Sequence, residues 1–242
     1  MGQLITPYKT RSSVDLVEKI LEADASGRIT IIGDKISKLG YPVDVEGFDN
    51  GYNIISGKDI RSDRIKVVSA HYDGDGAYDN AGGVVVVLNI MEKLRDGNYP
   101  LDELRFAFFD LEEDYQKGSE YHLSKAENRE NVVRNINIDG CGIGDKLFEV
   151  KEKYDLRCIN SPNTWTELIV RSDSLPFRKY GIHSKHFATL PEDEVEGLKN
   201  NLYPKTVSEV LGIFGRDDIS NISEDSLAYA RDALIEEIIG GD

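Results

Sequence analysis

Residues 71–79 of the chain read HYDGDGAYD, and this stretch decides the fold. The apolar run at residues 65–70 (IKVVSA) predicts a strand before it, and the pattern of residues 84–94 predicts a buried helix after it. Between them lies a glycine-rich loop with one imidazole and three carboxylates. Open α/β sheets bind ligands beyond the carboxyl ends of their strands, and imidazole nitrogen and carboxylate oxygen are zinc ligands. The stretch therefore predicts a divalent metal at the end of a strand.

Strand-like and helix-like patterns alternate along most of the chain. Such alternation predicts an α/β fold with a mainly parallel sheet covered on both faces, and the length of 242 residues favours a single domain over residues 1–242. The expected helices begin at Ser12 or Ser13 and then cover residues 29–39, 84–94, 118–124, 174–180 and 223–239. The expected strands cover residues 43–48, 52–57, 65–70, 104–111, 132–138, 168–171 and 186–190.

Composition excludes several classes of partner. The net charge is −15 and no cluster of lysine and arginine stands out in the sequence, so we expect neither nucleic acid nor a membrane as a partner. No apolar run has the ~20 residues that span a bilayer. Residues 1–15 lack the apolar core of a secretory signal, so we expect a cytoplasmic protein, or one whose leader has been removed. The two cysteines, Cys141 and Cys158, are expected as free thiols rather than a disulfide.

Acidic residues directly follow three of the most apolar predicted strands. They are Asp73 with Asp79, Glu112 with Glu113, and Asp139. A lone aspartate at a strand end is more often a turn or a helix cap, and a pair of glutamates is usually surface charge. In a parallel sheet, however, these strand ends lie along one edge, so the carboxylates and His71 can converge there. The pattern predicts a metal site at that edge.

The same residues lie in motifs that resemble the co-catalytic zinc aminopeptidases, of the aminopeptidase Y and bacterial leucyl aminopeptidase type. No single motif is specific, but their combination, order and intervals are. The resemblance covers most of the chain and implies a three-layer α/β/α zinc-exopeptidase (phosphorylase/hydrolase-like) architecture with a mainly parallel mixed sheet. The motifs are SAHYDG (69–74), YDNAGG (78–83), FFDLEEDYQKGSEY (108–121), NINIDGCG (135–142) and SDSLPFRKYGI (172–182).

The resemblance implies a set of metal ligands. His71 and Asp139 would hold one zinc ion, Asp79 would bridge two ions, and Glu113 would hold the second. Glycines at residues 82 and 83 would let the start of the following helix approach the site closely. The implied cofactor is Zn²⁺, one or two per chain.

The resemblance also implies the catalytic residues. Glu112 would be the general base that deprotonates the attacking water, and Asp73 would orient His71. The expected activity is that of a metal-dependent exopeptidase, an aminopeptidase acting on a peptide or aminoacyl amide. The oligomeric state is left undecided, and a homo-oligomer is retained as an alternative because dimers are common among soluble proteins.

The chain departs from the family pattern at the last ligand. The family has a histidine before an isoleucine-rich helix entrance, but the corresponding residues 213–222 read IFGRDDISNI. Ser174 also stands where the family commonly has histidine. The replacement is left open: His183, His186, Asp217 or Asp218 could supply a ligand, or the second ion could be missing, with Arg216 supplying positive charge in its place.

Two other functions remain as alternatives. The missing histidine is compatible with a non-catalytic family member that binds a peptide or a partner. Related scaffolds also support glutaminyl cyclisation or carboxypeptidase chemistry. We rank cyclisation lowest, because such cyclases resemble this family but depend on the histidine that is absent here.

Overall fold

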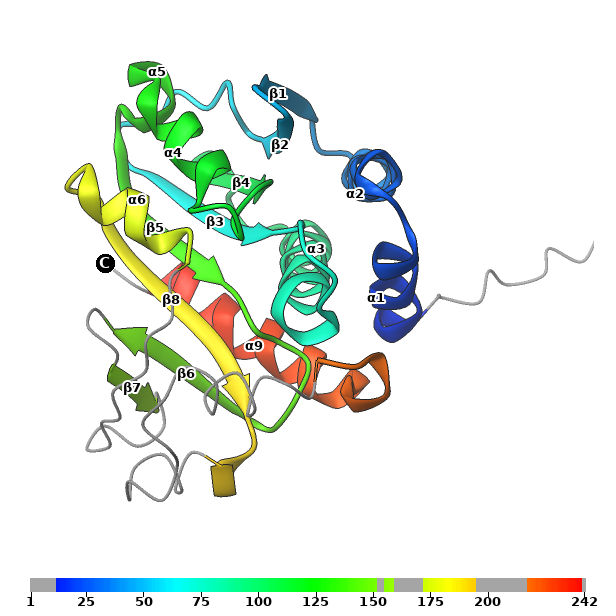
Figure 1. Cartoon of the computed structure of the whole chain (residues 1–242). Coiled ribbons are helices and arrows are strands. Elements are labelled where there is room, and N and C mark those ends of the chain that lie inside the picture. Colours follow the sequence, from blue (N-terminus) through cyan, green and yellow to red (C-terminus); the bar gives the residue numbers. More distant parts are fainter. Residues whose placement is uncertain (1–11, 152–154, 159–171, 195–216, 241–242) are drawn as a thin grey trace, which may run out of the picture.

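The computed structural model describes residues 12–151, 155–158, 172–194 and 217–240. Within these residues the chain forms an eight-stranded sheet in the order β1-β2-β4-β3-β5-β8-β6-β7 (Figure 1). The four central strands β4, β3, β5 and β8 are parallel, and the outer strands pair antiparallel. The strands are β1 (Asp44–Phe48), β2 (Gly51–Ser56), β3 (Ile65–His71), β4 (Leu104–Phe109), β5 (Val132–Ile138), β6 (Lys146–Lys151), β7 (Asp155–Cys158) and β8 (His183–Leu190).

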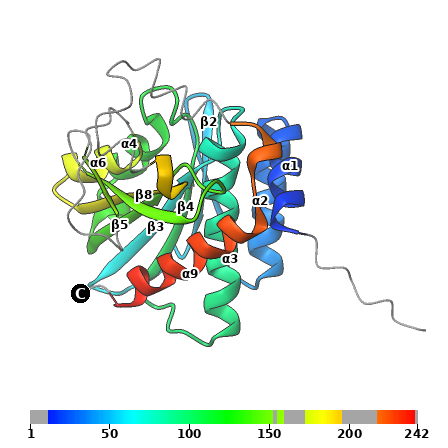
Figure 2. The ribbon, with the colours of Figure 1, turned by 90° about the horizontal axis from the view of Figure 1, so that it is seen from below.

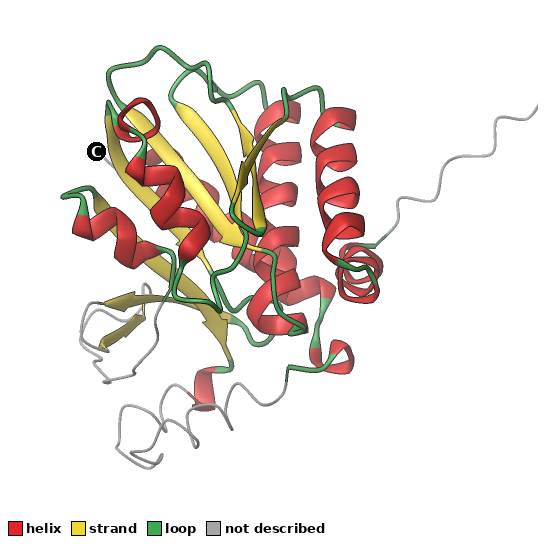
Figure 3. Cartoon of the chain, turned by 45° about the horizontal axis from the view of Figure 1, so that its top comes forward, coloured by secondary structure: helices red, strands yellow, loops and turns green. Residues whose placement is uncertain are grey.

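Helices cover both faces of this sheet. Figure 2 shows α1, α2, α3 and α9 on one side and α4 and α6 on the other, and Figure 3 shows the same layers in a second view. The prediction of a three-layer α/β/α fold is therefore confirmed. The helices are α1 (Ser13–Glu22), α2 (Ala25–Lys38), α3 (Gly83–Asp96), α4 (Lys117–Ser124), α5 (Ala126–Arg129), α6 (Ser174–Lys179) and α9 (Glu224–Gly240), with a π-helical turn η1 (Ala77–Gly82) and a 3₁₀ turn η2 (Ile219–Asn221).

Alternation along the strands divides the core between the two faces. Val68 and Ala70 of β3 join the larger core, with α1, α2, α3 and α9. Val67 joins the smaller core on the opposite face, where it meets Leu123 of α4 and Phe177 of α6. Successive residues of a strand point to opposite faces, so a strand buried on both sides must be apolar throughout. This explains why the central strands read as continuous apolar runs.

Helix α3 is buried on nearly every side. Residues 84–88 (VVVVL) are all 0% exposed, between the sheet and the helices α1, α2 and α9. Four consecutive valines are weak helix formers, so packing rather than propensity holds this helix. Each fully buried valine or leucine stabilises the fold by roughly 1.5–3 kcal/mol.

Each expected element within the described residues is observed, and α5, β6, β7, η1 and η2 are additional to the prediction. Strands β6 and β7 are absent from the prediction, because their short sequences, KLFEVK and DLRC, carry charges between the apolar residues. The strand expected at residues 168–171 lies outside the described residues. Among the described helices, none has the length and apolar character needed to cross a bilayer.

Candidate metal centre

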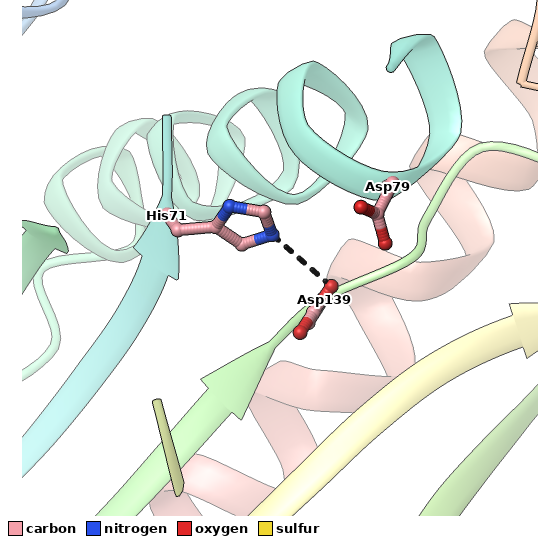
Figure 4. A group of neighbouring side chains, drawn as sticks. All are labelled: His71, Asp79 and Asp139. Carbon is pink, nitrogen blue, oxygen red and sulfur yellow. Dashed lines mark hydrogen bonds and ion pairs between the residues drawn. The ribbon is translucent and has the colours of Figure 1, made fainter. Parts of the chain in front are cut away.

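Three of the predicted ligands meet at the carboxyl edge of the parallel strands. One ligand atom from each of His71, Asp79 and Asp139 lies within 4.8 Å of the others. His71 ends β3, Asp139 follows the last residue of β5, and Asp79 projects from η1 (Figure 4). The His71 Nε2 atom lies 3.3 Å from Asp139 Oδ1. His71 and Asp139 are buried, and Asp79 is partly exposed, so the group faces solvent on one side.

Strand register brings His71 and Asp139 together. β3 and β5 pair in parallel with Ser69 opposite Asn137, so two residues further along His71 comes beside Asp139. The chain leaves β3 through α3 on one face to reach β4, then crosses through α4 on the other face to reach β5. β3 is thus a topological switch point, where open α/β sheets form their ligand crevices.

Close backbone approach places Asp79 against the other two ligands. A Cβ atom at Gly82 would lie 1.8 Å from the Cys141 carbonyl oxygen, and one at Gly83 would lie 2.6 Å from the Ile138 carbonyl oxygen. Only glycine permits such contacts. The expectation that these two glycines bring the helix start to the site is confirmed. The Cys141 amide also donates to the Tyr78 carbonyl at 2.9 Å, which fixes η1 to the loop after β5.

Asp73 connects the histidine to the loop that carries the two glutamates. Its Oδ1 atom lies 3.3 Å from His71 Nδ1 and accepts the Glu112 amide at 3.0 Å, while Oδ2 accepts the Glu113 amide at 3.1 Å. Leu111, just before this pair, has φ of 55°, which residues other than glycine rarely adopt. The Asp73 carboxylate therefore holds a strained loop and the Nδ1 edge of the His71 ring at the same time.

Arg28 on α2 holds the ligand loop from outside, a contact that sequence reasoning missed. This buried guanidinium donates to the Tyr72 carbonyl at 2.9 Å and to the Gly74 carbonyl, on either side of Asp73. Its Nε atom donates to the Ala23 carbonyl at 3.1 Å. Arg28 lies on the helix face that packs inward, where an arginine is rarely found without partners. The place of Arg28 on the buried face of α2 is the one signal that could have indicated this contact.

The charged groups at the site shift one another's pKa values. Although burial opposes it, the charge and hydrogen bond of Asp139 raise the pKa of His71 well above its usual value. Burial, reinforced by the charge of Asp139, raises the pKa of Asp79 to about 8. Two carboxylates packed this closely favour a cation between them. A donor set of one imidazole and two carboxylates suits zinc, so the residues present fit this metal.

Glu112 is a buried carboxylate beside this group. Burial, with the charges of Asp173 and Asp139, raises its pKa to about 9. Gln116 donates to its Oε1 atom at 2.8 Å. Asp173 is 0% exposed and accepts from Ser119 at 2.5 Å, while its Oδ2 atom has no hydrogen-bond partner among the described residues. Gln116 and Asp173 lie within the quoted motifs at residues 108–121 and 172–182, but neither was predicted as a site residue, because the motifs alone do not show which side chains contact the general base.

Glu113 lies at the rim rather than in the three-residue group. Its side chain is exposed, and its Oε1 atom would lie 3.2 Å from a Cβ atom at Gly74. Its charge contributes to the raised pKa of Asp79, so the two carboxylates are neighbours. Its role as a ligand of a second ion remains a prediction.

The residues considered as replacements for the missing histidine lie in different places. His186 is buried, with Nε2 3.7 Å from Asp139 Oδ2, outside the three-residue group. His183 begins β8, at the opposite end of the sheet. Asp217 accepts the backbone amides of Tyr78 at 2.5 Å and Asp79 at 3.2 Å. It is thus a cap on η1 in this structure.

The other two residues considered are Asp218 and Arg216. Asp218 is exposed and caps η2 through the Ser220 amide. Arg216 lies outside the described residues. His122 is buried in α4, with its Nδ1 atom 2.7 Å from Glu46 Oε2.

Comparison with known proteins assigns the central part of the chain. Residues 53–159 match the model of peptidase family M28. This region contains His71, Asp79, Asp139 and both glutamates, so the match covers every predicted ligand and the predicted base. The match agrees with the resemblance to zinc peptidases over this part of the chain, and the aminopeptidase activity is left to the proposal below. Among curated sequences, none matches the chain.

Solved structures share the fold at low sequence identity. A Porphyromonas gingivalis glutaminyl cyclase has a TM-score of 0.66 at 16% identity, with 94% of this chain and 98% of that chain covered. LapB from Legionella pneumophila has a TM-score of 0.70 at 12% identity, covering 96% and 72%. BSAP, a zinc aminopeptidase from Bacillus subtilis, has a TM-score of 0.54 at 21% identity, covering 78% and 50%. At these identities the comparisons show the fold, which extends beyond the M28 region.

Proposed function

We propose that this chain is a metal-dependent exopeptidase that hydrolyses the first amide bond of a peptide or an aminoacyl amide. The observation that supports this proposal most directly is the meeting of His71, Asp79 and Asp139 beside the loop that carries Glu112. The match of residues 53–159 to a peptidase family supports the same reaction class. A cytoplasmic location and the absence of nucleic-acid and membrane partners remain predictions from the sequence.

Each residue of the site has its own proposed role in the reaction. His71, Asp79 and Asp139 would hold zinc, which would supply a Lewis acid to polarise a carbonyl and lower the pKa of water. Glu112 takes the proton of the attacking water and delivers it to the leaving amine. Its burial makes it a stronger base than a solvated glutamate. Asp73 keeps His71 and the Glu112 backbone in register. Glu113 is the proposed ligand of a second ion, shared through Asp79.

The test is hydrolysis of aminoacyl-nitroanilides by zinc-loaded protein, with the metal content per chain measured in parallel. Replacing Glu112 by Gln should lower kcat/KM by about 10²–10⁴-fold while the zinc content stays unchanged. Asp114→Asn is the matched control, because this carboxylate lies on the same loop but is exposed and pairs with Lys117. Its activity should equal that of the wild type. Zinc-loaded protein that hydrolyses no aminoacyl or peptide substrate would favour the non-catalytic alternative.

Glutaminyl cyclisation is the second candidate, for one reason. The fold match covers 98% of the Porphyromonas gingivalis cyclase but only 50% of the Bacillus aminopeptidase. Mass spectrometry of a peptide with N-terminal glutamine separates the two activities. Loss of ammonia without release of the first residue would assign cyclisation. Release of glutamine would assign the peptidase.

A further inference from the structure

A hollow lined by basic side chains lies at the end of the sheet opposite the metal centre. It has a volume of about 340 Å³. Its residues come from α9, from the residue before β3 and from the beginnings of the parallel strands β3, β5 and β8, whereas His71 and Asp139 lie where strands end. The polar lining consists of Arg64, Lys66, Arg134, His183, Lys185 and Glu237.

Cations dominate this lining although the chain carries a net charge of −15. Four of the six polar residues are lysine or arginine and one is acidic. Arg134 is nearly buried, with a side chain 10% exposed, and Lys185 is 23% exposed. Both donate to Glu237. Lys66 Nζ donates at 3.1 Å to the Ile238 carbonyl, near the end of α9. These contacts hold Lys66, Arg134 and Lys185 in place around the hollow.

The charges around the hollow shift the pKa of His183. Burial and the positive charges of Arg134 and Lys185 lower its pKa, with Arg178 acting in the same direction and Glu149 opposing. Lysine and arginine side chains outnumber the one acidic residue of the lining, so the hollow carries net positive charge on a strongly acidic protein. Cations held partly out of water attract oxyanions more strongly than solvated ones do, and arginine and lysine are the side chains that bind them.

We propose that this hollow is a binding site for a small oxyanion with two or more negative charges, of phosphoryl or polycarboxylate type. Its volume suits a ligand of this size rather than a macromolecule. The site is separate from the metal centre, and the proposal holds whichever reaction that centre catalyses.

His183 is the reporter for the test. The protein is titrated with inorganic pyrophosphate at constant ionic strength, and the pKa of each histidine is followed by NMR. A bound anion favours the imidazolium form, so the pKa of His183 should rise by on the order of one unit at saturation. His71 and His186, at the metal centre, should not respond first. A parallel titration with citrate distinguishes phosphoryl from carboxylate ligands by which saturates at lower concentration.

Variants locate the site. Arg64→Gln and Lys185→Gln should each weaken binding by about tenfold or more, the effect of losing one charge-assisted hydrogen bond. Lys93→Gln removes the same charge from an exposed position on α3 outside the hollow and should leave binding unchanged. Thermal unfolding of each variant checks its fold. A response no larger than that of chloride, equal losses in all three variants, or a first response at His71 would overturn the proposal.

Discussion

The Asp217 carboxylate accepts the backbone amide of Asp79 at 3.2 Å, although the two residues are 138 positions apart in sequence. The same oxygen accepts the Tyr78 amide. A carboxylate that satisfies free amides at the start of a helical turn stabilises that turn and fixes its side chains. Asp217 thus positions a proposed metal ligand from the far end of the chain.

Removal of this cap should weaken metal binding. In Asp217→Ala we expect zinc affinity to fall by about 10–100-fold, with a loss of about 1–2 kcal/mol in the free energy of unfolding. Competition with a chromogenic chelator measures the affinity. Asp218→Ala is the control, since this residue is exposed and caps only η2. Equal zinc affinity in both variants would contradict the positioning role of Asp217.

Arg28 should affect both the stability of the fold and the affinity for zinc, although it lies far from the ligands in sequence. A lysine in its place cannot donate to the carbonyls of Ala23, Tyr72 and Gly74 together. We expect Arg28→Lys to lose about 2–3 kcal/mol of stability, because buried carbonyls lose their donors, and to bind zinc more weakly. Arg95→Lys, which changes a surface pair with Asp96, should do neither. Urea unfolding and the chelator assay report the two effects separately.

The glycine at position 82 should resist substitution. A methyl group there would meet the Cys141 carbonyl oxygen at 1.8 Å, so Gly82→Ala should cost more than about 3 kcal/mol or prevent folding. Gly33→Ala provides the contrast, because its Cβ atom would find only Val43 Cγ1 at 3.8 Å. In a helix that change should stabilise by about 0.5–1 kcal/mol. Similar unfolding midpoints for the two variants would refute the close approach.

Acid should weaken the fold through Glu46 and His122. Although burial opposes it, hydrogen bonds from His122 and Asn128 lower the pKa of Glu46 to about 2, and burial lowers the pKa of His122. The stability from Glu46 is present above its unfolded pKa of about 4.3 and is lost as pH falls toward 2. His122 adds a loss below about pH 6.5, because the unfolded chain takes up the proton. We expect Glu46→Gln to be less stable at neutral pH by about 3 kcal/mol and to depend less on pH between 5 and 3.

Metal-free protein should lose stability as pH rises. This pH dependence is opposite in sign to the one expected from Glu46 and His122. The pKa of Asp79 is raised to about 8 and that of Glu112 to about 9, so the folded state holds protons that the unfolded state releases above about pH 4.5. Each proton contributes up to about 1.4 kcal/mol per pH unit until the pH passes the folded pKa. The raised pKa of His71 acts in the same direction. Urea unfolding of chelator-treated protein between pH 6 and 8.5 should show this decline, and Asp79→Asn should reduce it.

The sequence by itself determined the layer order and the main ligands of the proposed site. Apolar runs at residues 65–70, 104–111 and 132–138 predicted the central strands, because strands buried on both faces must be apolar throughout. Residues directly after parallel strands share an edge, so His71, Asp79 and Asp139 could be grouped before any coordinates. The pattern and the sheet polarity predicted a shared edge, and the resemblance to zinc aminopeptidases implied which of the acidic residues there are ligands.

Only the tertiary structure decided the groups that depend on contacts between distant segments. Arg28, Asp173 and Asp217 reach the site from other elements. The basic hollow likewise draws its cations from three strand beginnings, although the sequence shows no basic cluster. Periodicity reports which face of an element is buried, but not which side chain meets it from elsewhere in the chain. These contacts between distant segments are fixed by how the helices and the sheet pack together.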